Sequence, residues 1–402
     1  MGGKAWKSVY WGAVFSLHEA KSPSTEAMRI GIPREIRADE TRVAATPDVV
    51  RRYVERGASV VVESGAGARA TFDDASYRAV GAEIADAAVW SVDVVLKVQP
   101  PTPEEAAGLA AGTVLISFLY PESNPETVVA LERARVTALA MESVPRIARA
   151  QKMDALSSMA NLAGYKAVLE AANAFGRFFP LLMTAAGTIP PAHVLVIGAG
   201  VAGLSAIVTA RRLGAVVRAF DPRPAVREQV QSLGARFLDL ELEAAETVGG
   251  YAAAQSQEFI GLERKLLAAQ MNEVDVVITT ALIRGQPAPV LITDEMLRAM
   301  KPGSIIVDLA VEQGGNCQAS RPDEVIEVAG VTVIGWTNFP ARMPVHASTL
   351  YSRNVQHLLH HLWGEAGLAF DFEDEIVDGA VILHAGSRRH SEEPMEATGQ
   401  GA

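Results

Sequence analysis

Three closely spaced glycines, followed by an acid, are the residues of this chain best suited to chemistry. Gly198, Gly200 and Gly203 form a G-x-G-x-x-G motif, and Asp221 lies 18 residues beyond Gly203. In such a turn the first glycine permits a tight bend, the second lets backbone approach a pyrophosphate, and the third lets a helix pack close to a strand. An acid about 20 residues further on accepts hydrogen bonds from a ribose 2′-hydroxyl. The spacing predicts a dinucleotide site.

The elements around the motif have the order that such a site needs. Residues 194–197 are an apolar run typical of a buried strand, 201–213 are typical of a helix that ends at Gly214, and 215–220 predict a second strand. Val201 and Ala202 would open the helix, whose free N–H groups and positive dipole end favour phosphate. The alternative is a glycine-tolerant turn without a ligand, which the order of strand, turn, helix, strand and acid disfavours.

Asp221 also bears on the choice of cofactor. A carboxylate accepts hydrogen bonds from two ribose hydroxyls and repels a 2′-phosphate. Arg223 and Arg227 lie nearby and could serve NADP(H). Because the acid itself is intact, we expect NAD(H).

Composition sets the bounds of the protein class. A chain of 402 residues favours two domains, and 49% hydrophobic with 6% aromatic residues suits an α/β protein rich in Ala and Val. The net charge of −11 argues against nucleic acid as a partner. The single cysteine, Cys317, excludes an intramolecular disulfide and fits a reducing compartment.

One long stretch raises the question of a membrane span. Residues 178–210 contain no Asp, Glu, Lys or Arg. Pro180, Pro190 and Pro191 interrupt it, however, and the glycine motif occupies its end. A strand, a loop and a helix therefore explain it better than a lipid-facing helix.

The alternation of predicted strands and helices gives the fold class, which is α/β with two doubly wound, Rossmann-like domains and a cofactor cleft between them. We expect residues 1–27 to be an N-terminal extension upstream of the true start, and 28–163 with 348–386 to form the first domain. Residues 164–347 would form the NAD-binding domain, with a mobile loop near 244–261, and 387–402 a disordered tail. Ligands bind beyond the carboxyl ends of parallel strands. That rule nominates three cofactor loops, with Thr280, Ala281 and Leu282 in the first, residues 310–315 as the second, and Asn338 in the third.

Several strings together resemble one known family. They include MRIGIPREI from Met28, ETRVAATP from Glu40, VLKVQPP from Val95 and RAQKMDALSSMANLAGY from Arg149, besides the glycine motif. Over about residues 28–386 the chain is similar to the alanine dehydrogenase/nicotinamide nucleotide transhydrogenase family. The more similar branch is the NAD(H)-binding subunit of proton-translocating transhydrogenase. In the divided bacterial form of that enzyme the alpha subunit consists of two chains, and this chain resembles the first of them.

The resemblance implies a nicotinamide-binding loop of the transhydrogenase branch. There Arg146, Gln151, Asp154 and Ser157 would hold the nicotinamide end of the cofactor. A carboxamide needs both a donor and an acceptor, which Gln supplies, and Arg donates a rigid fork. The alternative is a helix that Asp154 caps, with solvated neighbours. By the same resemblance Tyr251 belongs to a mobile loop that closes over nucleotide; the alternative is a surface loop with a chance Tyr.

The dehydrogenase branch differs at its catalytic positions. It has a catalytic His where this chain has Tyr120, so the group suited to acid–base work near neutrality is absent. Its substrate-binding Arg and Lys have counterparts in Arg42 and Lys97, which we expect to form ion pairs, and its catalytic Asp aligns with Glu312. The family commonly has Gln at Met159, a change that matters only if that position touches substrate.

Two further features favour simpler interpretations. His357, His360 and His361 have helical spacing, but no Cys, Asp or Glu completes a metal set, so we expect no metal. Cys317 has no base beside it in sequence.

The resemblance implies an enzyme component, the NAD(H) component of a Re/Si-specific proton-translocating NAD(P)⁺ transhydrogenase. It would pass hydride directly between NADH and NADP held on the beta subunit. A small membrane subunit, the second chain of the divided alpha subunit, would complete the complex, and this chain would be a cytoplasmic homodimer attached peripherally to the inner membrane. The alternatives are an alanine dehydrogenase-like amino acid dehydrogenase and a non-catalytic NAD-sensing module.

Overall fold

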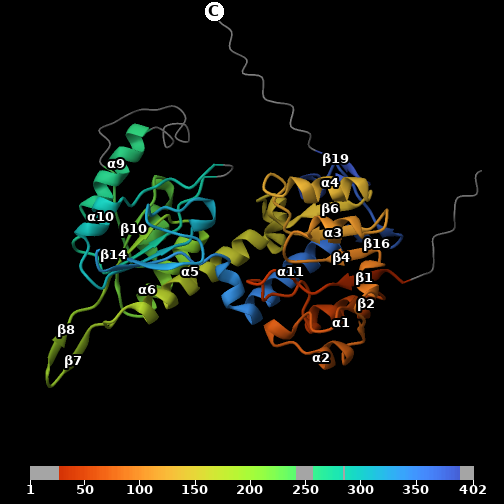
Figure 1. Ribbon diagram of the computed structural model, residues 1–402, viewed down its shortest axis with the longest axis horizontal. Coiled ribbons are helices and arrows are strands. Elements are labelled where there is room, and N and C mark those ends of the chain that lie inside the picture. The colour runs from red at the N-terminus through yellow and green to blue at the C-terminus, as the bar shows by residue number, and fades with distance from the viewer. Residues whose placement is uncertain (1–26, 241–256, 284–285, 390–402) are drawn as a thin grey trace, which may run out of the picture.

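Two parallel sheets dominate the structure, a computed structural model that describes residues 27–240, 257–283 and 286–389. Figure 1 shows one lobe built on each sheet, with helix α5 (Ala155–Ala174) running between the lobes. The expectation of an α/β protein with two doubly wound domains is confirmed.

The first sheet has eight strands in the order β19-β18-β6-β5-β4-β1-β2-β3. Strands β1 to β6 are parallel, and β18 and β19 add an antiparallel edge. Their bounds are β1 Arg29–Ile32, β2 Ser59–Val62, β3 Glu83–Ile84, β4 Val94–Leu96, β5 Val114–Ser117, β6 Thr137–Ala140, β18 Val381–His384 and β19 Ser387–Arg388. Since β19 lies beyond residue 386, the tail begins later than expected.

Proline and capping side chains start the helices of this lobe. Thr102 and Glu105 form a reciprocal capping box at α3, and Asp73 caps α2. The helices are α1 Pro47–Glu55, α2 Asp74–Arg78, α3 Pro103–Ala107, α4 Pro125–Arg133, α11 Pro344–Leu362 and α12 Glu375–Ala380, with a small β16 (Trp363–Gly364) and β17 (Gly367–Leu368) hairpin. The helix expected at 355–363 begins eleven residues earlier, because Pro344 starts it.

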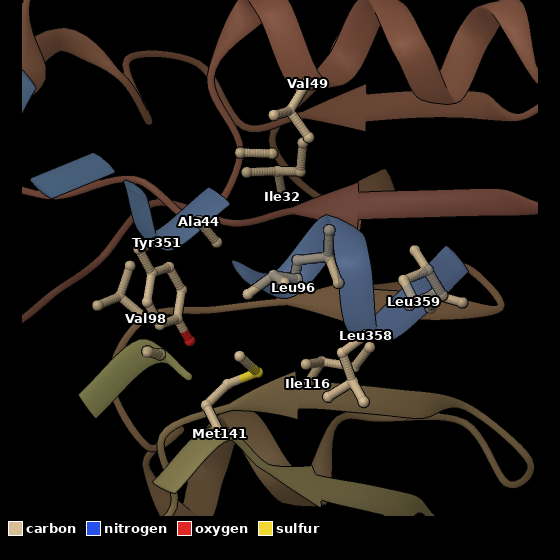
Figure 2. Close-up of a cluster of buried hydrophobic side chains, with 14 of the residues drawn as sticks. Ile32, Ala44, Val49, Leu96, Val98, Ile116, Met141, Tyr351, Leu358 and Leu359 are labelled. Atoms are coloured by element: carbon tan, nitrogen blue, oxygen red, sulfur yellow. The ribbon is translucent and has the colours of Figure 1, made fainter. Parts of the chain in front are cut away.

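Helix α11 returns to the first lobe and fills its core. Figure 2 shows Leu358 and Leu359 of this helix facing Leu96 and Ile116 of the sheet. Tyr351 is fully buried and donates its hydroxyl to the Lys97 carbonyl at 2.7 Å. Residues more than 200 positions apart therefore share one apolar core.

The second sheet has the order β11-β10-β9-β12-β13-β15-β14, and only β14 is antiparallel. Its strands are β9 His193–Ile197, β10 Val216–Phe220, β11 Arg236–Phe237, β12 Val276–Thr279, β13 Ile305–Asp308, β14 Val325–Val328 and β15 Val331–Ile334. Its helices are α6 Val201–Arg212, α7 Arg227–Ser232, α9 Gln257–Ala268 and α10 Asp294–Ala299. Helix α9 includes residues 257–261, which sequence assigned to the mobile loop; residues 241–256, with Tyr251, lie outside the described residues.

The charge-free stretch folds as strands and a helix. Its beginning forms the hairpin of β7 (Leu182–Thr184) and β8 (Gly187–Ile189), which projects away from the body in Figure 1. The remainder is β9 and the beginning of α6. Among the described residues we find no helix with the length and apolar character needed to cross a bilayer.

Helix α5 belongs to both cores. Met159 and Leu162 pack in the core of the first lobe, whereas Ala167 and Val168 pack in that of the second. Where α5 meets α6, a Cβ on Gly164 would lie 1.9 Å from the Ala202 carbonyl oxygen. The two backbones therefore touch at a point that admits only glycine.

This contact predicts a large effect of one methyl group. Gly164→Ala should lower the free energy of unfolding by about 1–3 kcal/mol, the usual cost of overpacking a core, although Ala is the better helix former. Gly176→Ala is the matched control, since a Cβ there meets nothing within 4 Å. Urea denaturation of both variants checks this, and equal stability of the two would contradict the packing argument.

Candidate functional site

The three glycines of the motif have three different environments. Gly198 has φ +94°, and a Cβ there would lie 2.5 Å from Thr280 Oγ1. A Cβ on Gly203 would lie 1.8 Å from the Gly198 carbonyl oxygen. Gly200, the N-cap of α6, has nothing within 4 Å of its Cβ position. Turn, close packing and open approach thus fall where sequence predicted them, and the open space at the helix N-terminus fits a pyrophosphate.

Asp221 lies at the carboxyl end of β10 and braces this turn. Its Oδ2 accepts a 2.7 Å hydrogen bond from the Ala199 N–H. The guanidinium of Arg223 binds both carboxylate oxygens, at 2.9 and 3.0 Å. The acid is 5% exposed. It is therefore held beside the glycine turn, where a ribose would lie.

A second carboxyl near Asp221 escaped the sequence analysis. Glu263 of α9 is 5% exposed. Burial, and then the charge of Asp221, raise the pKa of Glu263 to about 7. In sequence this residue has only the helical spacing of α9 to mark it, and its proximity to Asp221 comes from the fold.

The loop after β12 contacts the turn directly. Thr280 donates its hydroxyl toward the carbonyl oxygens of Gly198 and Ile197, at 3.1 and 3.3 Å. Leu282 is half exposed. Thr280 thus supports the turn through its side chain, and the proposed cofactor contacts of Thr280, Ala281 and Leu282 stay predictions.

The four residues of the nicotinamide loop lie together at the start of α5 and divide into two pairs. Asp154 caps the helix, accepting hydrogen bonds from Ser157 N at 2.8 Å and Ser157 Oγ at 2.6 Å. Gln151, on a 3₁₀ turn (Ala148–Met153), and Arg146 expose their side chains. The helix-cap interpretation therefore describes Asp154 and Ser157, while Gln151 and Arg146 are available to a ligand.

Helix α5 connects this loop to the phosphate turn. With a rise of 1.5 Å per residue, Ala155 lies roughly 14 Å along the helix from Gly164, which touches the first turn of α6. The Asn354 side chain of α11 fixes the loop by donating to the Lys152 carbonyl at 2.9 Å. The two ends of the predicted cofactor site are thus joined by one rigid element.

Asn338 links the two lobes. Its Nδ2 donates to Asp39 at 3.2 Å and to Glu40 at 3.1 Å, and its Oδ1 accepts from Arg42 at 3.0 Å. Its backbone N–H donates to Glu312 at 2.5 Å. Since these contacts engage its amide, the cofactor contact predicted for Asn338 stays a prediction.

Arg42 and Lys97 form buried ion pairs. Arg42 binds Glu40 through two nitrogens, at 2.7 and 2.6 Å. Burial alone would raise the pKa of Glu40, but the Arg42 charge and its hydrogen bonds hold that pKa at about 2. Lys97 is 1% exposed and lies 3.2 Å from Glu105 and 3.6 Å from Glu35. Neither cation is free to bind a substrate carboxylate.

Tyr120 stands at the dehydrogenase's histidine position with φ +42°. Its ring stacks on Phe118 at 5.6 Å, and its N–H donates to the carboxylate of Glu142. Burial, and then the charge of Glu142, raise the pKa of Tyr120 well above its usual value. The phenol therefore stays protonated near neutrality and cannot act as a base there.

The remaining sequence candidates have structural surroundings. Met159 is 6% exposed and faces the core of the first lobe, so the change from Gln has no consequence for a ligand. His361 lies 2.9 Å from Asp374, and His360 packs edge-on against Tyr53. Burial raises the pKa of Cys317 to about 11. Within the described residues, no three or more His, Cys, Asp or Glu side chains are grouped as metal ligands.

Comparison with family models decides the kinship of the chain. The N-terminal domain model of alanine dehydrogenase/PNT matches residues 31–163, and the C-terminal domain model matches 167–391. The chain belongs to the alanine dehydrogenase/PNT family.

Individual relatives within this family favour one branch. The chain is 47% identical over 388 residues to the first chain of the divided NAD(P) transhydrogenase subunit alpha of Rhodospirillum rubrum, covering 93% of this chain and 100% of that one. It is 32% identical to alanine dehydrogenase of Bacillus subtilis, covering 82% and 83%. The crystal structure of transhydrogenase from Sinorhizobium meliloti superposes with a TM-score of 0.81 at 45% identity, covering 90% and 99%. An L-alanine dehydrogenase structure gives 0.76 at 28% identity, covering 90% and 97%.

The geometry around Asp221 predicts cofactor discrimination. The unmutated chain should bind NADH more tightly than NADPH, because the carboxylate attracts ribose hydroxyls and repels a 2′-phosphate. Hydrogen bonds to a charged group are worth about 1.5–3 kcal/mol, so Asp221→Asn should weaken NADH binding about tenfold or more and narrow the gap. Calorimetry measures both ligands. Asp239→Asn, which removes an exposed carboxylate, is the control, and equal affinities of the unmutated chain would contradict the assignment.

Proposed function

We propose that this chain is the NAD(H)-binding subunit of a proton-translocating, Re/Si-specific NAD(P)⁺ transhydrogenase. The observation that carries the proposal is the pairing of an open phosphate turn at Gly200 with the exposed Gln151 and Arg146 at the start of α5. The names of the most similar relatives agree with it. Hydride would pass directly between NADH on this chain and NADP on a partner subunit, coupled to proton movement through membrane subunits.

The proposed site has distinct tasks at its two ends. The helix N-terminus at Val201 and Ala202 binds the pyrophosphate, and Asp221 binds the adenosine ribose. At the other end Gln151 accepts from and donates to the carboxamide, while Arg146 donates to it. NADH, when bound, supplies the hydride. No residue of this chain needs to move a proton, since transfer between two nicotinamides depends on positioning and exclusion of water.

The amino acid dehydrogenase alternative meets obstacles in the site. Tyr120 stays protonated near neutrality and replaces the histidine of that branch. Arg42 and Lys97, which would bind a substrate carboxylate, are held in buried ion pairs. A non-catalytic NAD sensor would need no exposed Gln151 and Arg146 at the nicotinamide end. Both alternatives therefore leave features unexplained that a transhydrogenase uses.

The assembly belongs to the same proposal. The partners are an NADP-binding beta subunit and a small membrane subunit, the second chain of the divided alpha subunit, which attach this chain peripherally to the inner membrane. A homodimer is supported by the β7–β8 hairpin, which exposes Met183 by 73%, Leu181 by 54% and Ile189 by 41%. Apolar side chains on a projecting arm suit burial against a second copy.

The division of the chain follows the two cores. We propose residues 28–163 with 348–386 as the first domain and 164–347 as the NAD-binding domain. The burial of α11 in the first core supports the discontinuous boundary. Helix α5 crosses it.

Gln151 offers the sharpest test of the positioning role. Gln151→Asn keeps the amide but shortens its arm by one methylene, roughly 1.5 Å. A displacement near 1 Å can cost about a hundredfold in rate, so transhydrogenation with partner subunits should fall about that much. NADH affinity should fall by less than about tenfold, since one hydrogen bond is worth about 0.5–1.5 kcal/mol. Single-turnover hydride transfer and equilibrium binding measure the two effects.

The exposed Gln229 of α7 provides the control, because Gln229→Asn makes the same change away from the site. A fall of rate and affinity by the same factor would make Gln151 a binding residue. If neither changed, the loop would be only a helix cap.

A further inference from the structure

The side chain of Asn316 clamps the backbone of Ala281. Its Oδ1 accepts a 2.9 Å hydrogen bond from the Ala281 N–H, and its Nδ2 donates to the Ala281 carbonyl at 2.8 Å. Nδ2 also donates to the Pro289 carbonyl at 2.9 Å. Asn316 is 0% exposed. Three of the hydrogen bonds that one carboxamide can make therefore hold a single loop.

Two left-handed glycines bring Asn316 to this place. Gly314 and Gly315 have φ +101° and +85°, which turn the chain back after β13. A Cβ on Gly315 would lie 2.8 Å from Asp308 Oδ2. The buried Asp308 accepts from the Cys317 N–H at 3.0 Å and from Ser320 at 2.7 Å. The segment that carries Asn316 is thus itself fixed.

The clamp acts where the strand ladder has ended. Strands β12 and β13 pair up to Thr279 and Asp308. Ala281 lies two residues beyond, and its N–H nitrogen would lie 3.2 Å from a Cβ on Gly198. The amide of Asn316 therefore replaces the missing ladder partner and presses this loop against the phosphate turn.

We propose that Asn316 is a positioning residue for the dinucleotide, which orients the peptide units of Ala281 so that the loop and Leu282 meet the bound cofactor. This inference rests on the proposed function, because it takes NAD(H) as the ligand of the glycine turn. Asn316 acts through Ala281 and need not touch the cofactor.

Asn316→Asp is the most direct variant. It keeps the acceptor for the Ala281 N–H but places a carboxylate against the carbonyl oxygens of Ala281 and Pro289. Near pH 8 its NADH dissociation constant should rise about 10- to 100-fold. Acidification to about pH 5.5 should recover part of the affinity, since burial raises a carboxyl's pKa and the protonated acid again donates. Asn316→Ala should lose affinity without recovery, and it carries the affinity test if the acid variant does not fold.

The matched control is Asp275→Asn, the reverse exchange at the amino ends of the same strands. Asp275 is buried and accepts from the His193 N–H at 2.9 Å. Its variant should keep the NADH dissociation constant within about twofold. Thermal denaturation of the cofactor-free variants measures general destabilisation, which a merely structural role of Asn316 would share with this control.

Three outcomes would overturn the inference: unchanged NADH affinity in Asn316→Asp, an equal loss in Asp275→Asn, or no recovery of Asn316→Asp on acidification. The proposed function is tested separately by transhydrogenation of the unmutated chain with partner subunits. Tight NADH binding that needs Asn316, without transhydrogenation, would overturn that function and support the inference.

Discussion

The close approach of backbone to backbone at the start of α6 is the contact on which the rest of the structure depends. Gly203 packs on the Gly198 carbonyl from one side, and Gly164 of α5 packs on the Ala202 carbonyl from another. Because no side chain separates these elements, the phosphate turn, α6 and α5 form one rigid unit. The same helix begins at Asp154, beside Gln151. A single contact thus sets the spacing between the two ends of the proposed cofactor site.

Buried charge organises the other lobe and its link to the first contact. Glu40, Arg42 and Asn338 connect the lobes through hydrogen bonds that only paired groups can make at low exposure. A dehydrogenase needs its arginine and lysine free for a substrate carboxylate, whereas here both are neutralised by protein carboxylates. The family scaffold is therefore retained while its oxo-acid chemistry is not supported.

Local patterns were enough to predict much of this arrangement. Apolar runs and glycines marked β9, α6 and β10, and Asp154 marked the start of α5, because each signal is contained in a few adjacent residues. The hairpin of β7 and β8 was missed, since its strands are short and exposed and lack alternation. Glu263 and Asn316 were missed for another reason: their partners, Asp221 and Ala281, are distant in sequence, so only the assembled sheet brings them together.

The central claim is that this chain holds NADH for direct hydride transfer to a second nicotinamide. The most direct measurement follows deuterium from C4 of labelled NADH in membranes that contain the partner subunits, NADP⁺, pyruvate and ammonium. The account predicts that the label passes to C4 of NADPH undiluted by solvent protons, and that alanine stays unlabelled. Label in alanine, or label lost to water, would contradict it.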